Sequence, residues 1–486
     1  MAAEIYPLAK TGGLADVVSA LAKALAEFDT EVRLLMPAYP PALEQIAAPR
    51  LESECGALAG GAAPRLLAGR MPESGLPVWL LDCPELFRRP GSPYADEHGR
   101  DWPDNARRFA ALSEAAVRIA RGQTGIDWRP DVVHCHDWHA GLVPMWLHFA
   151  PQPRPRSVFT IHNAAFAGKF SLAAARGLGV PPAALGMDGA EFYGDFSFLK
   201  AGIRYADKIT TVSPTYAREI CTPEFGCGLD GLLRARSADL VGIMNGIDSD
   251  LWNPASDPHL ARRYARADCG GKDACKAELQ RSLGLRVDAD APLAIFVSRI
   301  TQQKMADVLL QHLPDLMRRV PRMQFAMLGR GEPDLEAGFS RMQDALPGRA
   351  AVRIDYTEPM AHRLHAGGDM LLHGSRFEPC GLVQLYAMRY GTVPVVRRVG
   401  GLADSVTDAD EEHPVPTGFV FDEPSGGALM SAVERGVGTY RSDPARWRGL
   451  QRNAMASDFG WSRSARDYAA LFGAAQAQAP AFQRAA

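Results

Sequence analysis

Two cations follow a predicted strand in the second half of the chain. Arg299 and Lys304 lie between an apolar segment that ends before Ser298 and a helical pattern whose apolar stripe covers residues 308–317. Two positive charges beside the free amides of a helix start could bind a diphosphate. Two cations on a surface loop would give the same pattern, so this motif alone leaves both interpretations open.

A carboxylate motif follows in the same half. Glu378 lies in the segment 375–382, directly before a second helical pattern, and Gly400 and Gly401 follow the next predicted strand. A carboxylate at this position could cap the helix, which is worth about 1 kcal/mol, or accept hydrogen bonds from sugar hydroxyls. Considered together, the cations, the carboxylate and the backbone amides predict a site for a nucleotide sugar.

The first half has its own polar cluster. Residues 134–139, His-Cys-His-Asp-Trp-His, end one predicted strand, and residues 160–163, Thr-Ile-His-Asn, end another. Strand alternation places His134 and His136 on one face and Cys135 on the other, which does not suit a tetrahedral zinc site. We therefore favour a polar sugar-binding edge or a buried histidine pair over a metal site.

Two Asp-Ala-Asp sequences resemble the DxD motif that holds a divalent cation in other sugar transferases. They occupy residues 288–290 and 408–410, and neither directly follows a buried apolar strand. We expect both to lie in surface loops, and the sequence predicts no metal site and no cofactor.

A glycine turn near the N-terminus gives a weaker signal. Lys10 precedes Gly12 and Gly13, and the apolar residues that follow recur at helical spacing as far as Phe28. Free N–H groups at the start of this helix, together with the lysine charge, could hold a phosphate. A plain tight turn is the alternative.

Short apolar strands that alternate with helical patterns must position these residues. The strands of the first half comprise residues 32–36, 78–81 and 132–135, and those of the second half comprise residues 293–297, 324–328, 352–354, 370–372 and 393–396. Such alternation predicts an α/β fold with parallel sheets. Because the rhythm restarts in the second half, we expect two domains with a ligand cleft between them.

The expected domains are residues 1–245 and residues 246–473. Proline, glycine and charged residues interrupt the periodicity after residue 251, so we place a hinge near residues 245–254. The Ala-, Gln- and Pro-rich tail, residues 474–486, is expected to be disordered. Few residues precede the glycine turn, so we expect a truncated first strand, caused by a start codon placed too late.

Composition excludes several classes of protein. The 486 residues carry a formal net charge of −3, and the basic residues are scattered, which gives no footprint for nucleic acid or an anionic membrane. No apolar run is long enough to span a membrane. The eight cysteines show no CxxC spacing, which fits a reducing cytoplasm.

The motifs resemble, in order and spacing, those of bacterial glycogen synthases. The segments that carry the resemblance are residues 10–14 (Lys-Thr-Gly-Gly-Leu), 136–139, 160–163, 245–248 (Asn-Gly-Ile-Asp) and 375–382. Further segments at 93–94, 101–105, 198–202 and 212–217 extend the similarity from about residue 3 to about residue 470.

The resemblance implies a glycosyltransferase-B fold, in which two Rossmann-like, doubly wound domains face each other across a cleft. It also implies transfer of glucose from ADP-glucose to the non-reducing end of an α-1,4-glucan such as glycogen, with retention of configuration and release of ADP. The preference for ADP over UDP rests on the resemblance alone.

The same resemblance implies roles for individual residues. Arg299 and Lys304 would neutralise the diphosphate, Glu378 would hold the glucose hydroxyls, and His162 and Asp137 would line the sugar site as further catalytic residues. The substrate-binding residues that it implies are Lys10, Gly12, Gly13, Tyr94, Asn245, Cys380, Gly381 and Leu382.

Some positions depart from the family pattern. Met305 stands where glycine is usual, His373-Gly374 replaces an apolar-Pro pair, and Val383 stands where a small polar residue or Asn is common. Related retaining transferases carry a second Glu eight positions after the first. Tyr386 stands there in this chain, as in glycogen synthases, which supports the narrower resemblance.

Double displacement would need a carboxylate nucleophile, and the motifs offer no clear one, so we favour front-face transfer. A catalytically weakened glucan-binding protein is one alternative. A phosphorylase-like enzyme is another, but none of the eight lysines has an obvious setting for pyridoxal phosphate.

Overall fold

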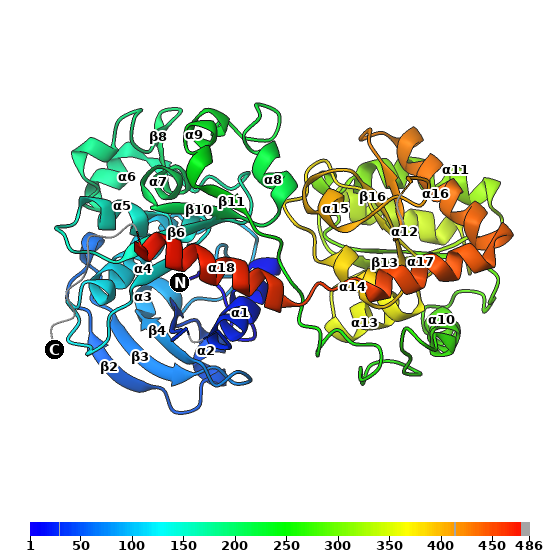
Figure 1. Cartoon of the computed structure of the whole chain (residues 1–486), viewed down its shortest axis with the longest axis horizontal. Coiled ribbons are helices and arrows are strands. Elements are labelled where there is room, and N and C mark those ends of the chain that lie inside the picture. The colour runs from blue at the N-terminus through cyan, green and yellow to red at the C-terminus, as the bar shows by residue number, and fades with distance from the viewer. Residues whose placement is uncertain (29, 413–414, 478–486) are drawn as a thin grey trace. The chain divides into compact units, whose positions relative to one another are not determined.

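The computed structural model describes residues 1–28, 30–412 and 415–477. The described chain forms two compact units, which Figure 1 shows with their elements labelled. The first unit holds Met1–Gly246 and the residues from Trp461 onward, and the second holds Ile247–Gly460. Every helix among the described residues is too short or too polar to span a lipid bilayer.

The first unit contains two four-stranded sheets. The strands of one, in spatial order, are β1 (Leu34–Pro37), β4 (Pro77–Asp82), β3 (Arg65–Arg70) and β2 (Arg50–Glu54). The strands of the other are β11 (Leu240–Gly242), β10 (Lys208–Thr211), β6 (Arg156–Ile161) and β5 (Val132–His136). The second sheet is parallel throughout, as predicted, whereas β3 pairs antiparallel with both its neighbours.

The opening residues connect these two sheets. The backbone N–H of Ala2 donates to Leu35 O on β1 at 3.1 Å, while His136 N–H on β5 donates to Met1 O at 3.2 Å. The Met1 ammonium donates to His134 O at 2.8 Å, and Ala2 and Ile5 are fully buried. Residues 1 and 2 therefore bridge β1 and β5, although no strand is assigned ahead of the glycine turn among the described residues.

Helices cover the sheets of the first unit. Its longer helices are α1 (Gly13–Ala26), α4 (Asn105–Ala120), α5 (Leu142–Phe149), α7 (Phe198–Tyr205) and α18 (Trp461–Ala477). Its shorter helices are α2 (Pro40–Gln45), α3 (Pro84–Phe87), α6 (Leu172–Gly177), α8 (Pro214–Glu219) and α9 (Asp230–Ala235). A small antiparallel sheet, β7 (Lys169–Ser171), β9 (Asp195–Ser197) and β8 (Glu191–Phe192), completes the unit.

The second unit is a doubly wound sheet of six parallel strands. Their spatial order is β14 (Ala350–Ile354), β13 (Gln324–Gly329), β12 (Leu293–Val297), β15 (Met370–His373), β16 (Val393–Arg397) and β17 (Phe419–Phe421). Counted from β12 along the chain, this order is 3-2-1-4-5-6, the arrangement of a Rossmann fold. The five predicted strands of this half are confirmed.

The helices of the second unit pack around this sheet. They are α10 (Gly270–Ser282), α11 (Ala306–Arg319), α12 (Pro333–Ala345), α13 (Glu358–Gly367), α14 (Val383–Arg389), α15 (Gly400–Ser405), α16 (Gly426–Ser442) and α17 (Pro444–Ala456). The apolar stripe of α11, which includes Leu309 and Leu313, is buried in the core beside Phe296 and Phe325. The sheet and α11 therefore form one rigid support for the loops that follow the strands.

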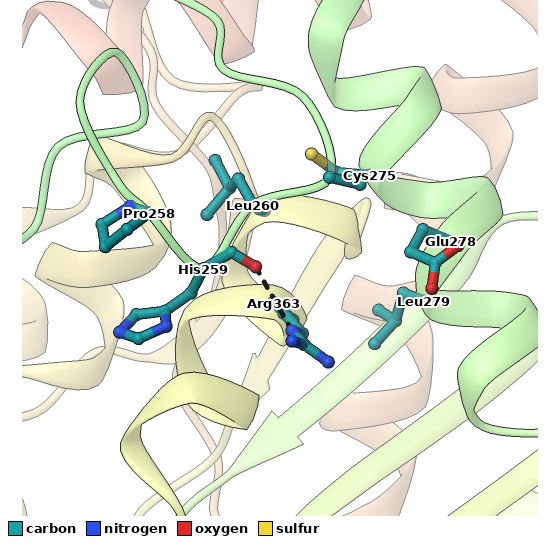
Figure 2. Close-up of a pocket in the computed structure, with 9 residues that line it drawn as sticks. Pro258, His259, Leu260, Cys275, Glu278, Leu279 and Arg363 are labelled. Atoms are coloured by element: carbon teal, nitrogen blue, oxygen red, sulfur yellow. Dashed lines mark hydrogen bonds between the residues drawn. The ribbon is translucent and has the colours of Figure 1, made fainter.

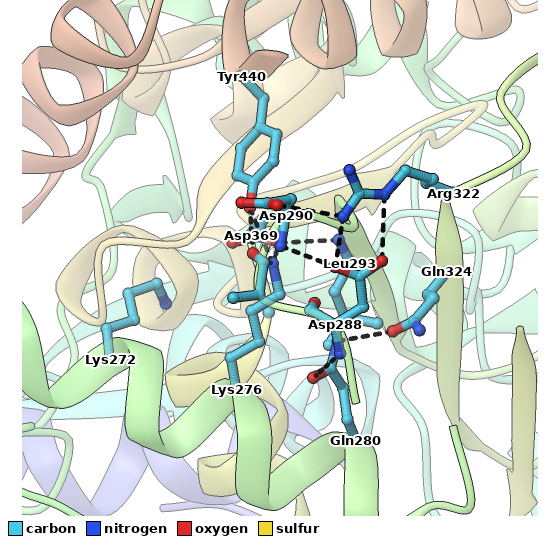
Figure 3. A network of polar contacts seen from close by, with 12 residues as sticks. Lys272, Lys276, Gln280, Asp288, Asp290, Leu293, Arg322, Gln324, Asp369 and Tyr440 are labelled. Carbon is cyan, nitrogen blue, oxygen red and sulfur yellow. Dashed lines mark hydrogen bonds and ion pairs between the residues drawn. The ribbon is translucent and has the colours of Figure 1, made fainter. Parts of the chain in front are cut away.

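Two buried lysines of α10 tie that helix to the sheet (Figure 3). Lys276 Nζ pairs with Asp369 at 2.7 Å, and Asp369 also accepts from Leu293 N–H at 2.8 Å. Lys272 Nζ donates to Thr392 Oγ1 at 2.7 Å and to backbone carbonyls, including Tyr390 O at 3.1 Å. Both side chains have structural partners, so neither is a candidate for carrying pyridoxal phosphate.

The position of α18 differs from the predicted domain boundary. Residues 461–473, assigned to the second domain from sequence, fold back onto the first unit, where Trp461 and Tyr468 pack against Val17 and Leu21 of α1. Residues 474–477 belong to this helix and were expected to be disordered; Ala475 is buried. Residues 478–486 of the predicted tail lie outside the described residues.

Candidate active site

The carboxyl ends of β12 and β15 are neighbours in the sheet of the second unit. The strand order reverses between these two strands, because β12 leads to β13 on one side and β15 leads to β16 on the other. Ligands of open α/β sheets bind outside the carboxyl ends at such a switch point. Arg299 and Lys304 follow β12, and Glu378 follows β15, so the topology brings these predicted site residues together.

Glu378 is the centre of this group. It is 5% exposed, and its Oε2 accepts hydrogen bonds from Lys304 Nζ, from Ser375 Oγ at 2.9 Å and from His373 Nε2 at 3.1 Å. Burial alone would raise the pKa of this carboxyl, but the Lys304 charge and the His373 hydrogen bond hold the pKa well below its usual range. Glu378 is thus an ionised acceptor.

The helix-capping interpretation of Glu378 does not hold. Helix α14 begins at Val383 with Leu382 as its N-cap residue, and it has no side-chain capping hydrogen bond. Glu378 instead points its carboxylate to Lys304, as the ion pair shows. Its carboxylate therefore belongs to the group at the switch point rather than to the start of α14.

Gln303 links the loops that carry the cations and the carboxylate. Its Oε1 accepts from Arg299 Nη2 at 2.9 Å, and its Nε2 donates to Phe377 O at 3.3 Å. Its backbone carbonyl accepts from Arg376 N–H at 2.8 Å. Arg299 is exposed, whereas the Lys304 side chain is largely buried against Glu378.

Met305 has a left-handed backbone conformation, with φ 54°. Glycine adopts this conformation without steric cost, which explains why glycine is usual at this position of the family pattern. The Met305 side chain is fully buried beside Gly374, where an added Cβ would lie 3.2 Å from Met305 Sδ. The two departures from the family pattern, Met305 and Gly374, therefore fit together.

The backbone after Glu378 packs closely on the glycine pair that follows β16. A Cβ added at Gly401 would lie 2.2 Å from Cys380 O, and Gly401 N–H donates to Glu378 O at 3.1 Å. Gly381 has φ 72°. Glycine at these two positions therefore sets the path of the backbone through Cys380, Gly381 and Leu382.

The glycine turn of the first unit opens helix α1, as predicted. Gly12 is the N-cap residue and is exposed, with no atom within 4 Å of an added Cβ. Lys10 Nζ pairs with Asp16 at 2.8 Å and lies 5.1 Å from the centre of the Tyr6 ring. Gly13 is the first residue of the helix, so its amide belongs to the free N-terminal set.

Glu4, which no sequence motif singles out, organises this turn. Its carboxylate accepts from Thr11 N–H and Oγ1 and, at 2.7 Å, from Tyr94 Oη. The Tyr94 ring stacks on His139 with the ring centres 4.6 Å apart. Glu4 is 2% exposed and thus joins the glycine turn to Tyr94 and to the histidine cluster.

The predicted face alternation of the histidines is confirmed. The rings of His134 and His136 lie 4.1 Å apart, His136 Nδ1 lies 3.0 Å from His162 Nε2, and His134 Nε2 lies 2.6 Å from Thr160 Oγ1. Burial lowers the pKa of all these imidazoles, that of His162 to about 3. They are neutral, hydrogen-bonding rings at the end of β5 and β6.

Asp137 has two unusual properties. Its backbone has φ 61° and ψ −178°, a conformation that costs a non-glycine residue roughly 1–3 kcal/mol and that clusters at functional sites. Burial raises the pKa of its carboxyl to about 8, against the opposing effect of backbone N–H groups from Trp138, Asn163 and His162. Within the described chain, Oδ1 is buried and has no hydrogen-bond partner.

Asn245 resembles Asp137 in one respect. It is 5% exposed, and its Oδ1 is buried without a hydrogen-bond partner among the described residues. It lies after β11, at the end of the first unit's parallel sheet. A buried, unpaired acceptor is costly, which is consistent with a residue whose partner is a ligand.

Arginines bind both Asp-Ala-Asp sequences. Arg322 Nη2 donates to Asp288 at 2.6 Å and to Asp290 at 3.2 Å. Arg435 pairs with Asp408 at 3.0 Å and with Asp410 at 2.6 Å. These carboxylates therefore already have cationic partners.

A cavity of about 250 Å³ lies elsewhere in the second unit, between α10, α13 and the loop at residues 258–261. Figure 2 shows Arg363 within it, donating from Nε to His259 O at 3.2 Å. None of the sequence motifs contributes to its lining. We do not assign it to the site.

Known proteins match this chain over almost its whole length. Residues 1–235 match the starch synthase catalytic domain family, and residues 283–437 match the glycosyl transferases group 1 family. The chain is 57% identical to a glycogen synthase of Burkholderia thailandensis, over 98% of this chain and 90% of that protein. It is 49% identical to a glycogen synthase of Paramagnetospirillum magneticum, over 96% and 95%.

The chain belongs to the glycogen and starch synthase family. Among solved structures, it resembles the catalytic domain of starch synthase IV from Arabidopsis thaliana, bound to ADP and acarbose, with a TM-score of 0.88, 32% identity and 98% coverage of both chains. A sucrose-phosphate synthase from Thermosynechococcus elongatus, 18% identical over 96% and 94% of the chains, shares the fold with a TM-score of 0.58. The predicted glycosyltransferase-B fold is confirmed.

This glycogen and starch synthase family member is therefore a glycosyltransferase, as the sequence predicted. Sequence reasoning missed residues that hold the motifs in place, chiefly Glu4, Gln303 and His373. Each is a polar side chain next to a motif, and its partners become visible only when distant loops are folded together. A buried polar residue at the end of a predicted strand, such as His373, is the one signal that was available.

Proposed function

We propose that the chain transfers glucose from ADP-glucose to the non-reducing end of an α-1,4-glucan, with retention of configuration and release of ADP. The observation that carries the proposal is the Lys304–Glu378 pair at the switch point of the second unit. It provides one cation for a phosphate and one ionised acceptor for sugar hydroxyls. A nucleotide-sugar donor has both groups.

The cations serve the leaving group. A diphosphate gains negative charge as the glycosidic bond breaks, and positive groups that meet this charge lower the barrier. Arg299 and Lys304 supply two charges, and Lys10, which lies beside the exposed Gly12 and Gly13 in the first unit, is proposed as a further phosphate-binding cation. Arginines already occupy the Asp-Ala-Asp sequences, so we propose that no divalent metal takes part.

The remaining residues hold the sugars. Glu378 and the backbone that follows it, at Cys380, Gly381 and Leu382, are proposed to bind the donor glucose. The neutral His162 ring is proposed to donate a hydrogen bond to, or accept one from, a glucose hydroxyl. The unpaired Oδ1 atoms of Asp137 and Asn245 are proposed to accept hydrogen bonds from glucose hydroxyls. Tyr94, which is fixed by Glu4 and His139, is proposed to contact substrate in the first unit.

Front-face transfer suits these groups better than double displacement. A glycosyl-enzyme intermediate needs an ionised carboxylate that is free to attack. Burial raises the pKa of Asp137 to about 8, so this carboxyl is protonated at neutral pH, and Glu378 is held by three donors. We propose instead that the leaving phosphate oxygen takes the proton of the acceptor hydroxyl.

We also propose that the protein works in the cytoplasm. None of the eight cysteines, all within the described residues, forms a disulfide, and four of them are buried with raised pKa values and hence unreactive: Cys55, Cys83, Cys135 and Cys275. A reducing compartment fits such a set.

Incorporation of radiolabelled glucose into glycogen from ADP-glucose and UDP-glucose, measured in parallel, tests the proposal. We expect at least a tenfold preference for ADP-glucose, which corresponds to roughly 1.4 kcal/mol. Equal or reversed use of the donors would overturn the nucleotide assignment. No incorporation from either donor would overturn the proposed function.

A further inference from the structure

His373 ends strand β15 and contacts the charged group at the switch point. It is 2% exposed, and its Nε2 lies 3.1 Å from Glu378 Oε2. Its register partner is Val396 on β16, so the strand fixes the backbone from which the ring extends. The imidazole is therefore held by the sheet itself rather than by a loop.

The proton of His373 can be assigned from its partners. Burial lowers the pKa of this imidazole, and the hydrogen bond to Glu378 only partly offsets that effect, so the ring is neutral. A carboxylate can only accept, so the single N–H lies on Nε2 and points at Glu378. In the described chain Nδ1 has no partner, which agrees with its being the unprotonated nitrogen.

The three hydrogen bonds that the Glu378 carboxylate accepts from Lys304, His373 and Ser375 all fall on Oε2. Lys304 is one of the three donors, and in the proposed function the same ammonium must also serve the diphosphate. When Lys304 turns toward phosphate, His373 and Ser375 still satisfy Oε2. The carboxylate then keeps its orientation, and Oε1 remains as an acceptor for a hydroxyl.

We propose that His373 is a positioning residue for the donor glucose: its Nε2–H holds Glu378 Oε2 while Lys304 engages the phosphates. The inference rests on the proposed function, since it assigns glucose to Glu378. The inference predicts different effects on two ligands, ADP-glucose and ADP. ADP has no glucose, so loss of His373 must weaken the use of ADP-glucose without weakening the binding of ADP.

Three substitutions separate positioning from packing. His373→Gln keeps an N–H donor near the place of Nε2, His373→Asn has a side chain too short to reach Glu378, and His373→Leu removes the donor while keeping the bulk. His365→Leu is the matched control, because His365 is an equally buried imidazole of the same unit whose ring contacts Trp252. Steady-state kinetics with ADP-glucose, calorimetry with ADP and thermal melting would be measured for each.

We expect His373→Leu and His373→Asn to lower kcat/KM for ADP-glucose about tenfold, since a hydrogen bond to a charged group is lost. His373→Gln should stay within about threefold of the unchanged protein, and Kd for ADP within about twofold in every variant. If His373→Leu does not fold, the inference is tested by comparing kcat/KM for ADP-glucose between His373→Gln and His373→Asn.

The inference would be overturned by full activity in a folded His373→Leu or His373→Asn variant, by a His373→Gln variant as impaired as His373→Asn, or by ADP binding that falls together with turnover. An effect of His365→Leu equal to that of His373→Leu would also overturn it. Inactivity of the unchanged protein toward every nucleotide-glucose donor would instead refute the proposed function on which the inference depends.

Discussion

Lys304 and Glu378 form an ion pair in which the two side chains are only 11% and 7% exposed. A salt bridge this buried gains little net stability, because desolvation of both charges offsets their attraction. Its retention at the switch point is better explained by a function in ligand binding.

Replacing Lys304 or Arg299 by alanine should reduce turnover about 10²- to 10³-fold, the range observed when one group that stabilises transition-state charge is removed. Arg318→Ala is the control, since Arg318 is an exposed cation of α11 paired with Asp315. Initial rates with ADP-glucose and glycogen measure the effect. Near-normal turnover in both single variants would contradict the proposed role of the cations.

Chelation should leave the rate nearly unchanged. The protein offers its own cations to the leaving group, and arginines hold the Asp-Ala-Asp carboxylates. The measurement is the rate after dialysis against EDTA, with and without added magnesium. Activity that disappears in EDTA and returns with magnesium would show that the charge assignment is wrong, although the family would stand.

Asp137→Asn should keep most of the activity below pH 8. Burial raises the pKa of the Asp137 carboxyl to about 8, so the native side chain is neutral there and asparagine resembles it in shape and charge. The native carboxyl ionises as the pH rises through about 8, whereas asparagine cannot. The two pH–rate profiles should therefore agree at pH 7 and separate above pH 8.

The variant Asp137→Ala is the control for Asp137→Asn. Asp137→Ala removes the hydrogen-bonding group and should lose activity at every pH. If Asp137→Asn is as inactive at pH 7 as Asp137→Ala, the carboxyl is ionised in the working enzyme, and the assigned protonation state is wrong.

Met305 and Gly374 should be energetically coupled. Gly374→Ala places a methyl group 3.2 Å from Met305 Sδ and should destabilise the protein by about 1–3 kcal/mol through overpacking. In a Met305→Gly background that side chain is absent, so the added methyl should cost less than about 0.5 kcal/mol. Urea unfolding of the two single variants and the double variant gives the coupling energy; additive values would rule out the contact.

The strands of the second unit were predictable because each is a buried parallel strand and therefore a continuous apolar run. Strand β12 was placed with its correct bounds. In the first unit, β2 and β3 were missed, since these antiparallel strands mix charged with apolar residues: Arg50, Glu52, Arg65 and Arg70. Local periodicity is weak in such a hairpin.

Site residues could be predicted only where a charged side chain lies within a motif of the family. Arg299, Lys304 and Glu378 could be named because the family pattern includes them, and parallel topology brings them together. The role of Gln303 as a link, and the fit of Met305 to Gly374, depend on contacts between residues about 70 positions apart, which no local pattern encodes. The domain of α18 was mistaken for the same reason, since an amphipathic helix does not specify which surface will cover it.

The return of α18 makes the second unit an insertion within the first. Its two ends are held together, because Ile247 N–H donates to Phe459 O at 2.8 Å and Ile247 pairs with Gly460. Residues 247–460 could therefore be excised as one segment with adjacent ends, which favours independent folding and circular permutation. Residues 1–246 could not be isolated as simply: without α18, the stripe of α1 formed by Val17, Leu21 and Leu25 would be exposed to water, and a fragment that ends there should aggregate.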